Sequence, residues 1–285
     1  MTTTEHQNWG VEALWQELEP LLPGLSIEVL ARAESTNTAL LERVKSEGRH
    51  PGERGAYGRR AHDMQPCLLV AEHQTHGRGR MGRSWHAVPG ASLTFSLAMP
   101  LDLADWSGLS LTVGCAIAEA LEPSGNAAPR LQLKWPNDIW LDGRKLGGIL
   151  IETVPAGGQR MAVIGIGLNV GHRPSDAAEA QFLTGFASLD ELEQDLTPPE
   201  VLRRIAGPLI RAVTSFGQTG FGAWASAYAR RDLLQGREIY AGALEGLGRG
   251  VNTQGELLLQ TAEGMQTISG GEVSIRLTAP PPVQD

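Results

Sequence analysis

Three arginines, Arg78, Arg80 and Arg83, alternate with glycines in the segment 77–83, and Trp85 follows it closely. Arginine carries a permanent charge and a planar fork of donors that suits carboxylate and phosphate oxygens. Glycine lets the main chain fold closely around a ligand and leaves its amides free to bind an anion. The segment therefore predicts a loop that holds a negatively charged small molecule, although a solvated basic turn has the same composition.

A second polar segment, Lys134-Trp135-Pro136-Asn137-Asp138, is expected at the end of a strand. Proline would interrupt a central strand, so the segment marks a sharp turn that presents Lys, Asn and Asp together. Further along, Lys145 precedes two glycines and an apolar run, which could bring an ammonium against the acid group of a ligand. The structural alternatives are a solvated turn and a lysine at the rim of a hairpin.

Three more segments carry little information when taken singly. Ser35-Thr36-Asn37 has the composition of a helix cap, and Gln74 follows a strand, where a lone glutamine is most often at the surface. The segment 165–170 resembles a dinucleotide fingerprint but lacks its third glycine and the following helix, so we reject that function.

The sequence lacks the usual metal and nucleophile motifs: it has no HExxH, CxxC or GxSxG and no histidine cluster. The polar segments instead carry cationic and hydrogen-bonding side chains. Such groups suit the stabilisation of phosphate and carboxylate charge, as in nucleotidyl transfer.

The 285 residues are enough for a large core and one small extra domain, and the composition is typical of a soluble protein. The formal net charge of -8 repels nucleic acid, so the arginines of the loop are a local feature. We find no signal peptide, and the most apolar stretch, 109–121, is too short to cross a bilayer. The two cysteines are expected to be buried thiols, and the protein to be cytoplasmic with no membrane contact.

Strand signals dominate the middle of the chain and follow one another too closely for crossover helices. This spacing predicts an α+β fold with a mixed, largely antiparallel sheet. The run 67–71 is apolar and predicts a buried strand, whereas 93–97 alternates and predicts a half-buried one. Asp142-Gly143 predicts a tight hairpin turn. Further strands are expected at 26–30, 131–135, 139–141, 148–152 and 162–169.

Beyond residue 234 the pattern changes to short apolar runs separated by glycine turns, which predicts a small β-barrel. We therefore expect a catalytic domain over 1–233, a barrel over 234–278 and a disordered tail over 279–285. The segment 48–66 is rich in Gly, Arg and Pro and predicts a long exposed loop. The expected barrel strands are 238–244, 257–260, 266–268 and 273–277. The expected helices are 9–22, 39–44, 107–121, 199–215 and 221–228.

Taken together and in this order, the polar segments resemble the biotin protein ligases. The resemblance spans roughly residues 26–276, and five ordered motifs are far more specific than any one of them. The matching segments are 35–37, 71–74 with 77–85, 134–138, 144–152 and 165–169, followed by 250–252, 255–259 and 269–274.

The resemblance implies a mixed sheet with helices, related to the class II aminoacyl-tRNA synthetases, and a Src-homology-3-like barrel. It implies a reaction in two steps. The biotin carboxylate attacks the α-phosphate of MgATP and gives biotinyl-5′-AMP and pyrophosphate. A lysine of a biotin carboxyl carrier protein then attacks the activated acyl group. Biotin, ATP and Mg²⁺ are the ligands implied, and the protein is expected to be a monomer or a weak homodimer.

The resemblance also implies roles for individual residues. The glycine-rich loop is expected to be mobile when empty and to close as a lid, with 171–179 as a second lid. Asp138 is a candidate for Mg²⁺ or for orienting the incoming lysine, and bracing the Lys134 turn is the alternative. The implied catalytic residues are Lys145, Arg78, Arg80 and Asp138. The implied biotin-binding residues are Ser35, Thr36, Asn37, Gln74, Arg78, Gly79, Arg80, Trp85, Lys145 and Gly148. The implied nucleotide-binding residues are Arg80, Trp85, Asn137, Lys145 and Asn169.

Two other functions stay open from the sequence. Lipoate ligases share the fold and the two-step chemistry, although the loop 77–83 and the segment 134–138 favour biotin. An Arg-Gly loop beside Trp85 could instead hold single-stranded nucleic acid, against which the net charge argues.

The sequence departs from the family pattern in two places. Only about 25 residues precede the first matching strand, too few for a helix-turn-helix domain, so no DNA-binding role is expected. The segment 48–65 is longer than usual.

Overall fold

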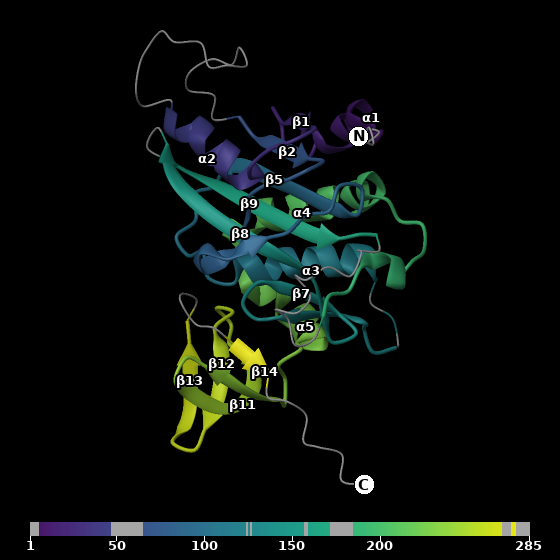
Figure 1. Cartoon of the computed structure of the whole chain (residues 1–285). Helices are drawn as coiled ribbons and strands as arrows, with labels where there is room; N and C mark the ends of the chain where they lie inside the picture. The colour runs from purple at the N-terminus through teal and green to yellow at the C-terminus, as the bar shows by residue number, and fades with distance from the viewer. Residues whose placement is uncertain are drawn as a thin grey trace.

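The computed structural model describes residues 6–46, 65–123, 125, 127–156, 159–171, 185–269 and 275–277. Its centre is a seven-stranded sheet in the order β1-β2-β5-β9-β8-β7-β6 (Figure 1). The pair β1–β2 is parallel and every other neighbouring pair in this sheet is antiparallel, which confirms the mixed sheet. Its strands are β1 (Ser26–Leu30), β2 (Cys67–Ala71), β5 (Ser92–Pro100), β6 (Leu131–Lys134), β7 (Asp138–Leu141), β8 (Arg144–Ala156) and β9 (Gln159–Asn169).

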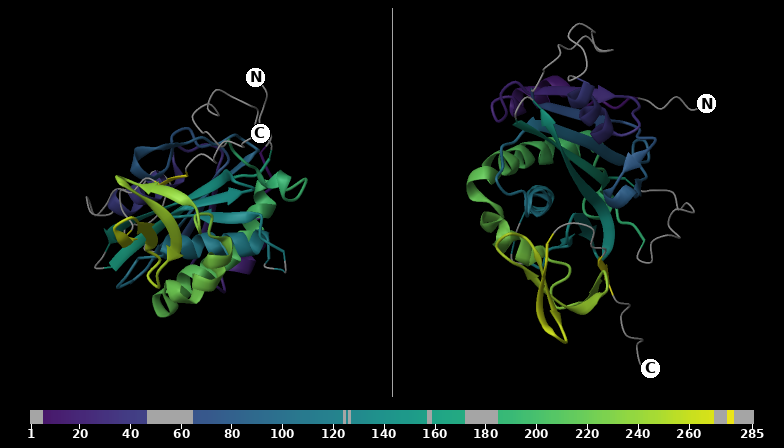
Figure 2. Two further views of the ribbon diagram at one scale, coloured as in Figure 1. Left: turned by 90° about the horizontal axis from the view of Figure 1, so that it is seen from below. Right: turned by 90° about the vertical axis from the view of Figure 1, so that its left-hand side faces the viewer.

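Helices cover both faces of this sheet (Figures 1 and 2). One face packs against α1 (Val11–Leu18), α3 (Leu109–Leu121) and α4 (Pro198–Thr219), and the other against α2 (Thr36–Ser46). The expectation of a half-buried strand at 93–97 is therefore wrong, because β5 is buried on both faces. Its small polar residues are buried and bonded within the protein instead of in water. Ser96, for example, lies 2.6 Å from Thr36 Oγ1.

Several elements differ in extent from their sequence patterns. The helix expected over 221–228 is a 3-10 helix, Phe221–Trp224, followed by the α-helix Ala225–Arg231. The helix expected over 9–22 is confined to α1, since Gly10 adopts a left-handed conformation before it and Pro20 follows its end. The strand expected at 148–152 extends over the whole of β8, which pairs with β9 from Gly147 onward. The hairpin turn at Asp142-Gly143 is confirmed, with φ angles of 47° and 76°.

The C-terminal strands form their own five-stranded antiparallel sheet, in the order β13-β12-β11-β10-β14. The run 238–244 is not one strand, because Gly242, at a φ of 62°, turns the chain into a hairpin. The boundary at 233/234 stays a prediction, and the tail 279–285 and most of the loop 48–66 lie outside the described residues. The strands are β10 (Glu238–Ala241), β11 (Leu244–Val251), β12 (Leu257–Thr261), β13 (Gly264–Ile268) and β14 (Ile275–Leu277), and α5 (Ala225–Arg231) precedes them.

The C-terminal sheet is fastened directly to the large sheet near β6. The Leu233 amide donates to the Leu133 carbonyl at 3.0 Å, and Trp135 Nε1 donates to the Gly255 carbonyl at 2.9 Å. A Cβ atom on Gly255 would lie 2.8 Å from Gly108 Cα, so the turn at Gly255 needs glycine for this close approach. The polar turn after β6 is thus held from behind by the C-terminal unit.

Asp232 lies in this junction with 9% of its surface exposed. Its Oδ1 accepts from the Leu234 amide at 2.9 Å and from the Tyr228 hydroxyl at 3.3 Å. Its Oδ2 has no hydrogen-bond partner among the residues that the structure describes. Burial raises the pKa of this carboxyl to about 6.

This raised pKa makes the fold less stable as the pH rises. The folded protein keeps the Asp232 proton up to about pH 6, whereas the unfolded chain releases it near pH 4, so stability is lost across that window. We expect Asp232→Asn to exceed the wild type in free energy of unfolding by about 1–3 kcal/mol at pH 8. The difference should shrink toward pH 4, as measured by urea denaturation of both proteins. Parallel pH profiles would contradict this assignment.

Candidate functional site

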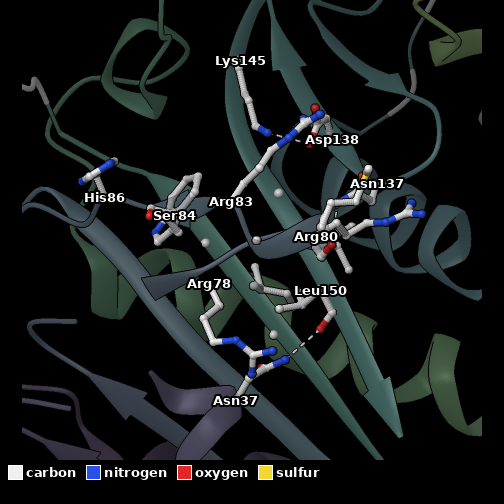
Figure 3. A pocket seen from close by; sticks show the side chains of 18 of the residues that line it. Asn37, Arg78, Arg80, Arg83, Ser84, His86, Asn137, Asp138, Lys145 and Leu150 are labelled. Carbon is white, nitrogen blue, oxygen red and sulfur yellow. Dashed lines mark hydrogen bonds and ion pairs between the residues drawn. The ribbon is translucent and has the colours of Figure 1, made fainter. Parts of the chain in front are cut away.

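One pocket on the α2 face of the sheet collects most of the polar segments singled out in the sequence (Figure 3). It lies between the start of α2, the loop that carries β3 (Gly77–Arg78) and β4 (Ser84–Trp85), the turn after β6, and the strands β8 and β9. The lining residues are Ser35, Thr36, Asn37, Gln74, Arg78, Gly79, Arg80, Met81, Arg83, Ser84, Trp85, His86, Lys134 to Asp138, Lys145, Gly148 to Leu150, Gly165 to Gly167 and Phe186.

One end of the pocket is a buried hydrogen-bonding network, here called the polar end. Gln74 Oε1 accepts from the Thr36 amide at 2.7 Å and from the Thr36 hydroxyl at 3.0 Å. Ser96 Oγ lies 2.6 Å from both Thr36 Oγ1 and Asn37 Oδ1. Asn37 Nδ2 donates to the Leu150 carbonyl at 3.2 Å. Because these groups are buried and mutually bonded, the polar end is preorganised.

Ser35 caps the start of α2, as its composition suggested, and it also lines the pocket. The Thr38 amide donates to Ser35 Oγ at 3.4 Å, at the start of α2. Capping places the two following residues, Thr36 and Asn37, against the sheet. The cap and the pocket lining are therefore one arrangement.

Two glycines of β9 form the floor under this network. A Cβ atom on Gly165 would lie 2.1 Å from Asn37 Oδ1, and one on Gly167 would lie 2.5 Å from the Trp85 ring. Any side chain at either position would displace Asn37 or Trp85. The segment 165–169 was one of the matching motifs, and the structure gives a reason for its glycines. At these two positions β9 lies too close to α2 and to the arginine loop for a side chain.

The arginine loop is anchored at its base and projects at its tip. Arg78 Nη2 pairs with Glu152 Oε1 at 2.9 Å, and Glu152 Oε2 also accepts from Asn37 Nδ2 at 3.0 Å. The Gly79 amide donates to the Arg83 carbonyl at 2.7 Å, which closes the tip on itself. Met81 at this tip is 57% exposed and has a φ of 56°. Arg78 therefore belongs to the polar end, whereas Arg80 and Arg83 lie toward the other end (Figure 3).

At that other end, here called the cationic end, positive charge gathers around one carboxylate. Lys145 Nζ donates to Asp138 Oδ1 at 2.7 Å. Burial lowers the pKa of Lys134; the charge of Asp138 opposes this, and the charges of Lys145 and Arg83 add to it. Burial likewise lowers the pKa of Arg80, opposed by the charge of Asp138 and assisted to a smaller extent by that of Arg83. Asp138 is the only carboxylate among the described residues that line the pocket, so this end can hold further negative charge.

The two asparagines assigned to the nucleotide, Asn137 and Asn169, donate their side-chain amides to main-chain carbonyls. Asn137 lines the pocket, but its Nδ2 donates to the Ile149 carbonyl at 2.8 Å and its own carbonyl accepts from the Ile149 amide at 3.0 Å. Asn169 is fully buried, is not among the lining residues, and donates to the Ala187 carbonyl at 3.0 Å. Both side chains brace the main chain in this structure, and their contact with a nucleotide stays a prediction.

Sequence reasoning gave no role to several residues that complete the pocket. Arg83 and Lys134 stood inside quoted motifs, and their charge was the available signal. Ser96 was masked by the alternation of its strand, which suggested a solvent-facing hydroxyl. Glu152 ended the quoted segment 144–152 without being given a role, and Phe186 carried no signal, since the fold alone brings it to the pocket.

Within the described ranges, no cluster of three or more His, Cys, Asp or Glu residues could hold a metal ion. In the same ranges, none of the helices combines the length and hydropathy needed to span a bilayer. The segment 171–179, expected to form a second lid, lies outside the described residues except for Gly171.

Comparison with known proteins agrees with this geometry. Residues 60–169 match the biotin/lipoate A/B protein ligase family, and residues 239–276 match the biotin protein ligase C-terminal domain. The chain is 34% identical over 262 residues to the bifunctional ligase/repressor BirA of Escherichia coli, covering 90% of this chain and 75% of that protein. It is 31% identical over 259 residues to the biotin–[acetyl-CoA-carboxylase] ligase of Mycobacterium tuberculosis, covering 87% of this chain and 88% of that protein.

A solved structure gives the same result. The biotin protein ligase from Aquifex aeolicus in complex with biotin and ATP superposes with a TM-score of 0.67 at 27% identity, covering 90% of this chain and all of that one. Sequence and structure therefore agree, and the chain belongs to the biotin protein ligase family.

Proposed function

We propose that the protein is an ATP-dependent ligase that activates biotin as biotinyl-5′-AMP and transfers it to a lysine of a biotin carboxyl carrier protein. The observation that carries the proposal is the two-ended pocket, with a preorganised polar end and a cationic end in one cavity. A ligand with an uncharged hydrogen-bonding ring at one end and a carboxylate at the other fits this arrangement. The Escherichia coli and Mycobacterium tuberculosis relatives are named as ligases, and the Aquifex protein was solved with biotin and ATP.

The polar end suits the ureido ring of biotin. Its donors and acceptors must be matched in a site that excludes water, and Thr36, Asn37 and Gln74 supply both kinds of group from buried positions. Arg78 closes the network above Asn37 through Glu152. With the ring there, the valerate chain of biotin can extend along the glycine floor and place its carboxylate at the cationic end.

The cationic end suits the first chemical step. A carboxylate oxygen of biotin attacks the α-phosphorus of ATP, the bond to the bridging oxygen of pyrophosphate breaks, and pyrophosphate leaves with the electron pair. Both reactants are anions, so Lys145, Arg80 and Arg83 would reduce their repulsion and stabilise the charge that develops on the leaving group. Trp85, packed over Gly167, would wall in the adenylate beside them.

Mg²⁺ enters this scheme as part of the substrate MgATP. A magnesium ion bound to phosphates needs only one or two carboxylates from the protein. Asp138 is the carboxylate at the cationic end, and it would exchange its hydrogen bond with Lys145 for the metal. Bracing the turn after β6 is its other role. In the second step the amine of the carrier lysine attacks the acyl carbon of the adenylate and AMP leaves.

The direct test combines the protein with biotin, MgATP and a purified carrier domain, and measures the mass of the carrier. We expect one biotinyl group on one lysine, and ATP–pyrophosphate exchange that depends on biotin. Replacing biotin with lipoate tests the alternative in the same family, and submicromolar lipoate binding without biotin binding would overturn the choice. Salt-dependent oligonucleotide binding without any exchange would support the nucleic-acid alternative.

The protein would act in the cytoplasm, as a monomer or weak homodimer, on a carboxylase's carrier domain. The net charge of -8 supports the absence of a role on DNA. A gel-shift titration that shows sequence-specific operator binding would contradict it.

Arg80→Ala is expected to loosen retention of the adenylate. Arg80 lies in the loop toward the cationic end, and its charge would hold the phosphate of the bound intermediate (Figure 3). We expect release or hydrolysis to become about tenfold faster, since a hydrogen bond to a charged group contributes about 1.5–3 kcal/mol. Preformed adenylate can be chased with unlabelled biotin to measure this. Arg249→Ala, an exposed arginine of β11, is the control, and equal retention in both variants would count against the lid.

A further inference from the structure

The main chain of Lys145 is held by residues 185–191, here called the return segment. The Ala187 amide donates to the Lys145 carbonyl at 2.9 Å, and Phe186 forms an isolated parallel bridge with Lys145. Phe186 also lines the pocket. The return segment therefore contacts the pocket in two ways, through Phe186 and through the backbone of the central lysine.

The residue before Lys145 fastens this segment from the side. Arg144 Nη1 donates to the Phe186 carbonyl at 3.1 Å, and the same guanidinium forms a two-pronged ion pair with Glu191. The hydrogen bonds with Glu191 raise the pKa of Arg144. Arg144 thus grips the return segment at both of its ends, while its covalent neighbour is Lys145.

Glu191 also organises the segment internally. Its Oε1 accepts from the Ser188 amide at 3.1 Å, which forms a capping box over residues 188–191. The Arg130 guanidinium donates to the Glu191 carbonyl at 3.1 Å, and the Asp190 amide donates to the Val170 carbonyl at 2.9 Å. One carboxylate therefore couples the shape of the segment to its attachment on β8.

We propose that Arg144 and Glu191 are positioning residues for adenylate formation: their ion pair holds the return segment so that Phe186 and Lys145 keep their places at the cationic end. The inference rests on the proposed function and adds two residues to it. Neither side chain touches the reacting atoms, and both act through the return segment.

Stability alone does not explain a two-pronged ion pair at this place. The side chains of Arg144 and Glu191 are 36% and 34% exposed, and ion pairs with such exposure contribute about 1 kcal/mol or less to folding. Catalysis is far more sensitive to position, because a misplacement of about 1 Å can lower a rate by about 10²-fold. The pair can therefore matter for the reaction while the fold tolerates its loss.

The test uses Arg144→Ala, Glu191→Ala and the double variant in the full chain. We expect biotin-dependent ATP–pyrophosphate exchange to fall about tenfold in each, in kcat or in the KM for ATP. Biotin binding, measured by calorimetry without ATP, should stay within about twofold because the polar end is separate. The double variant should lose no more than the worse single variant, since both side chains act through one contact.

The matched control is Arg204→Ala with Glu193→Ala. This pair lies just beyond the return segment, has a similar two-pronged geometry and is 39% and 49% exposed. It should leave both measurements unchanged. Arg144→Lys and Glu191→Gln keep more of the contacts and should lie between wild type and the alanine variants.

A measurement independent of activity completes the test. Hydrogen–deuterium exchange of peptides covering 185–191 should become faster in Arg144→Ala and not in Arg204→Ala. Three results would each overturn the inference. They are unchanged ATP–pyrophosphate exchange in the single variants, a loss of biotin affinity as large as the loss of that activity, and additive losses of activity in the double variant. If the wild type itself forms no adenylate, the proposed function fails instead, and the two failures are told apart.

Discussion

Lys145→Ala is expected to abolish formation of biotinyl-5′-AMP while the protein stays folded. Lys145 brings its ammonium to the cationic end from the start of β8, where it pairs with Asp138 at 2.7 Å. Without it, Asp138 would lose the cation bonded to it, and less positive charge would remain where two anionic substrates must meet. Removal of one such stabilising group typically costs on the order of 10²–10³-fold in rate, and the added repulsion places this variant at the upper end.

Biotin-dependent ATP–pyrophosphate exchange measures this effect directly. Thermal denaturation should show a transition close to that of the wild type, because the Lys145 side chain lies at the pocket rather than in the core. Lys45→Ala, at an exposed position of α2, removes the same charge elsewhere and should exchange normally. Near-normal exchange in Lys145→Ala would refute the catalytic role.

Gly165→Ala is expected to destroy biotin binding through a single methyl group. The new Cβ would lie 2.1 Å from Asn37 Oδ1, far inside van der Waals contact. The strand cannot move away, because Gly165 is paired with Ser96 on one side and with Leu150 on the other. Asn37 must therefore leave its bonds to Ser96 and Glu152, and the buried Ser96 hydroxyl left behind costs about 1–3 kcal/mol.

We expect the affinity for biotin to fall by about 10²-fold, measured by calorimetry, with a smaller effect on ATP binding. Gly222→Ala is the matched control, since a Cβ atom there meets nothing within 4 Å. Ser96→Ala probes the same network without a clash and should weaken biotin binding to a lesser extent. Normal biotin affinity in Gly165→Ala would show that the polar end does not hold biotin.

The sequence predicts the charged residues of the site better than the residues that hold them in place. Arg78, Arg80 and Lys145 were identified because charge and glycine spacing are local properties, and the structure places all three at one pocket. Gln74 could be singled out only through its neighbours in the chain. Its bond to Thr36 joins residues that are 38 positions apart, which no local pattern encodes.

The parts that could not be predicted depend on contacts between distant segments. Ser96 alternates with apolar neighbours as a solvent-facing residue would, and only the packing of α2 buries it. Asn169 was assigned to the nucleotide by its motif, and its amide donates to the Ala187 carbonyl, a contact between distant segments that no local pattern encodes. Phe186 reaches the pocket only because the return segment folds back on β8.

The hydrogen bond from Trp135 to Gly255 limits how far the C-terminal unit can be treated as an interchangeable module. Trp135 stands between Lys134 and the turn that carries Asn137 and Asp138, so its indole is anchored by a chain segment 120 residues away. A graft that replaces the C-terminal sheet with one from a relative would have to reproduce the turn at Gly255 as well as the strands. Otherwise, the recipient would keep every residue of the pocket and lose the fixed backbone on which the cationic end is built.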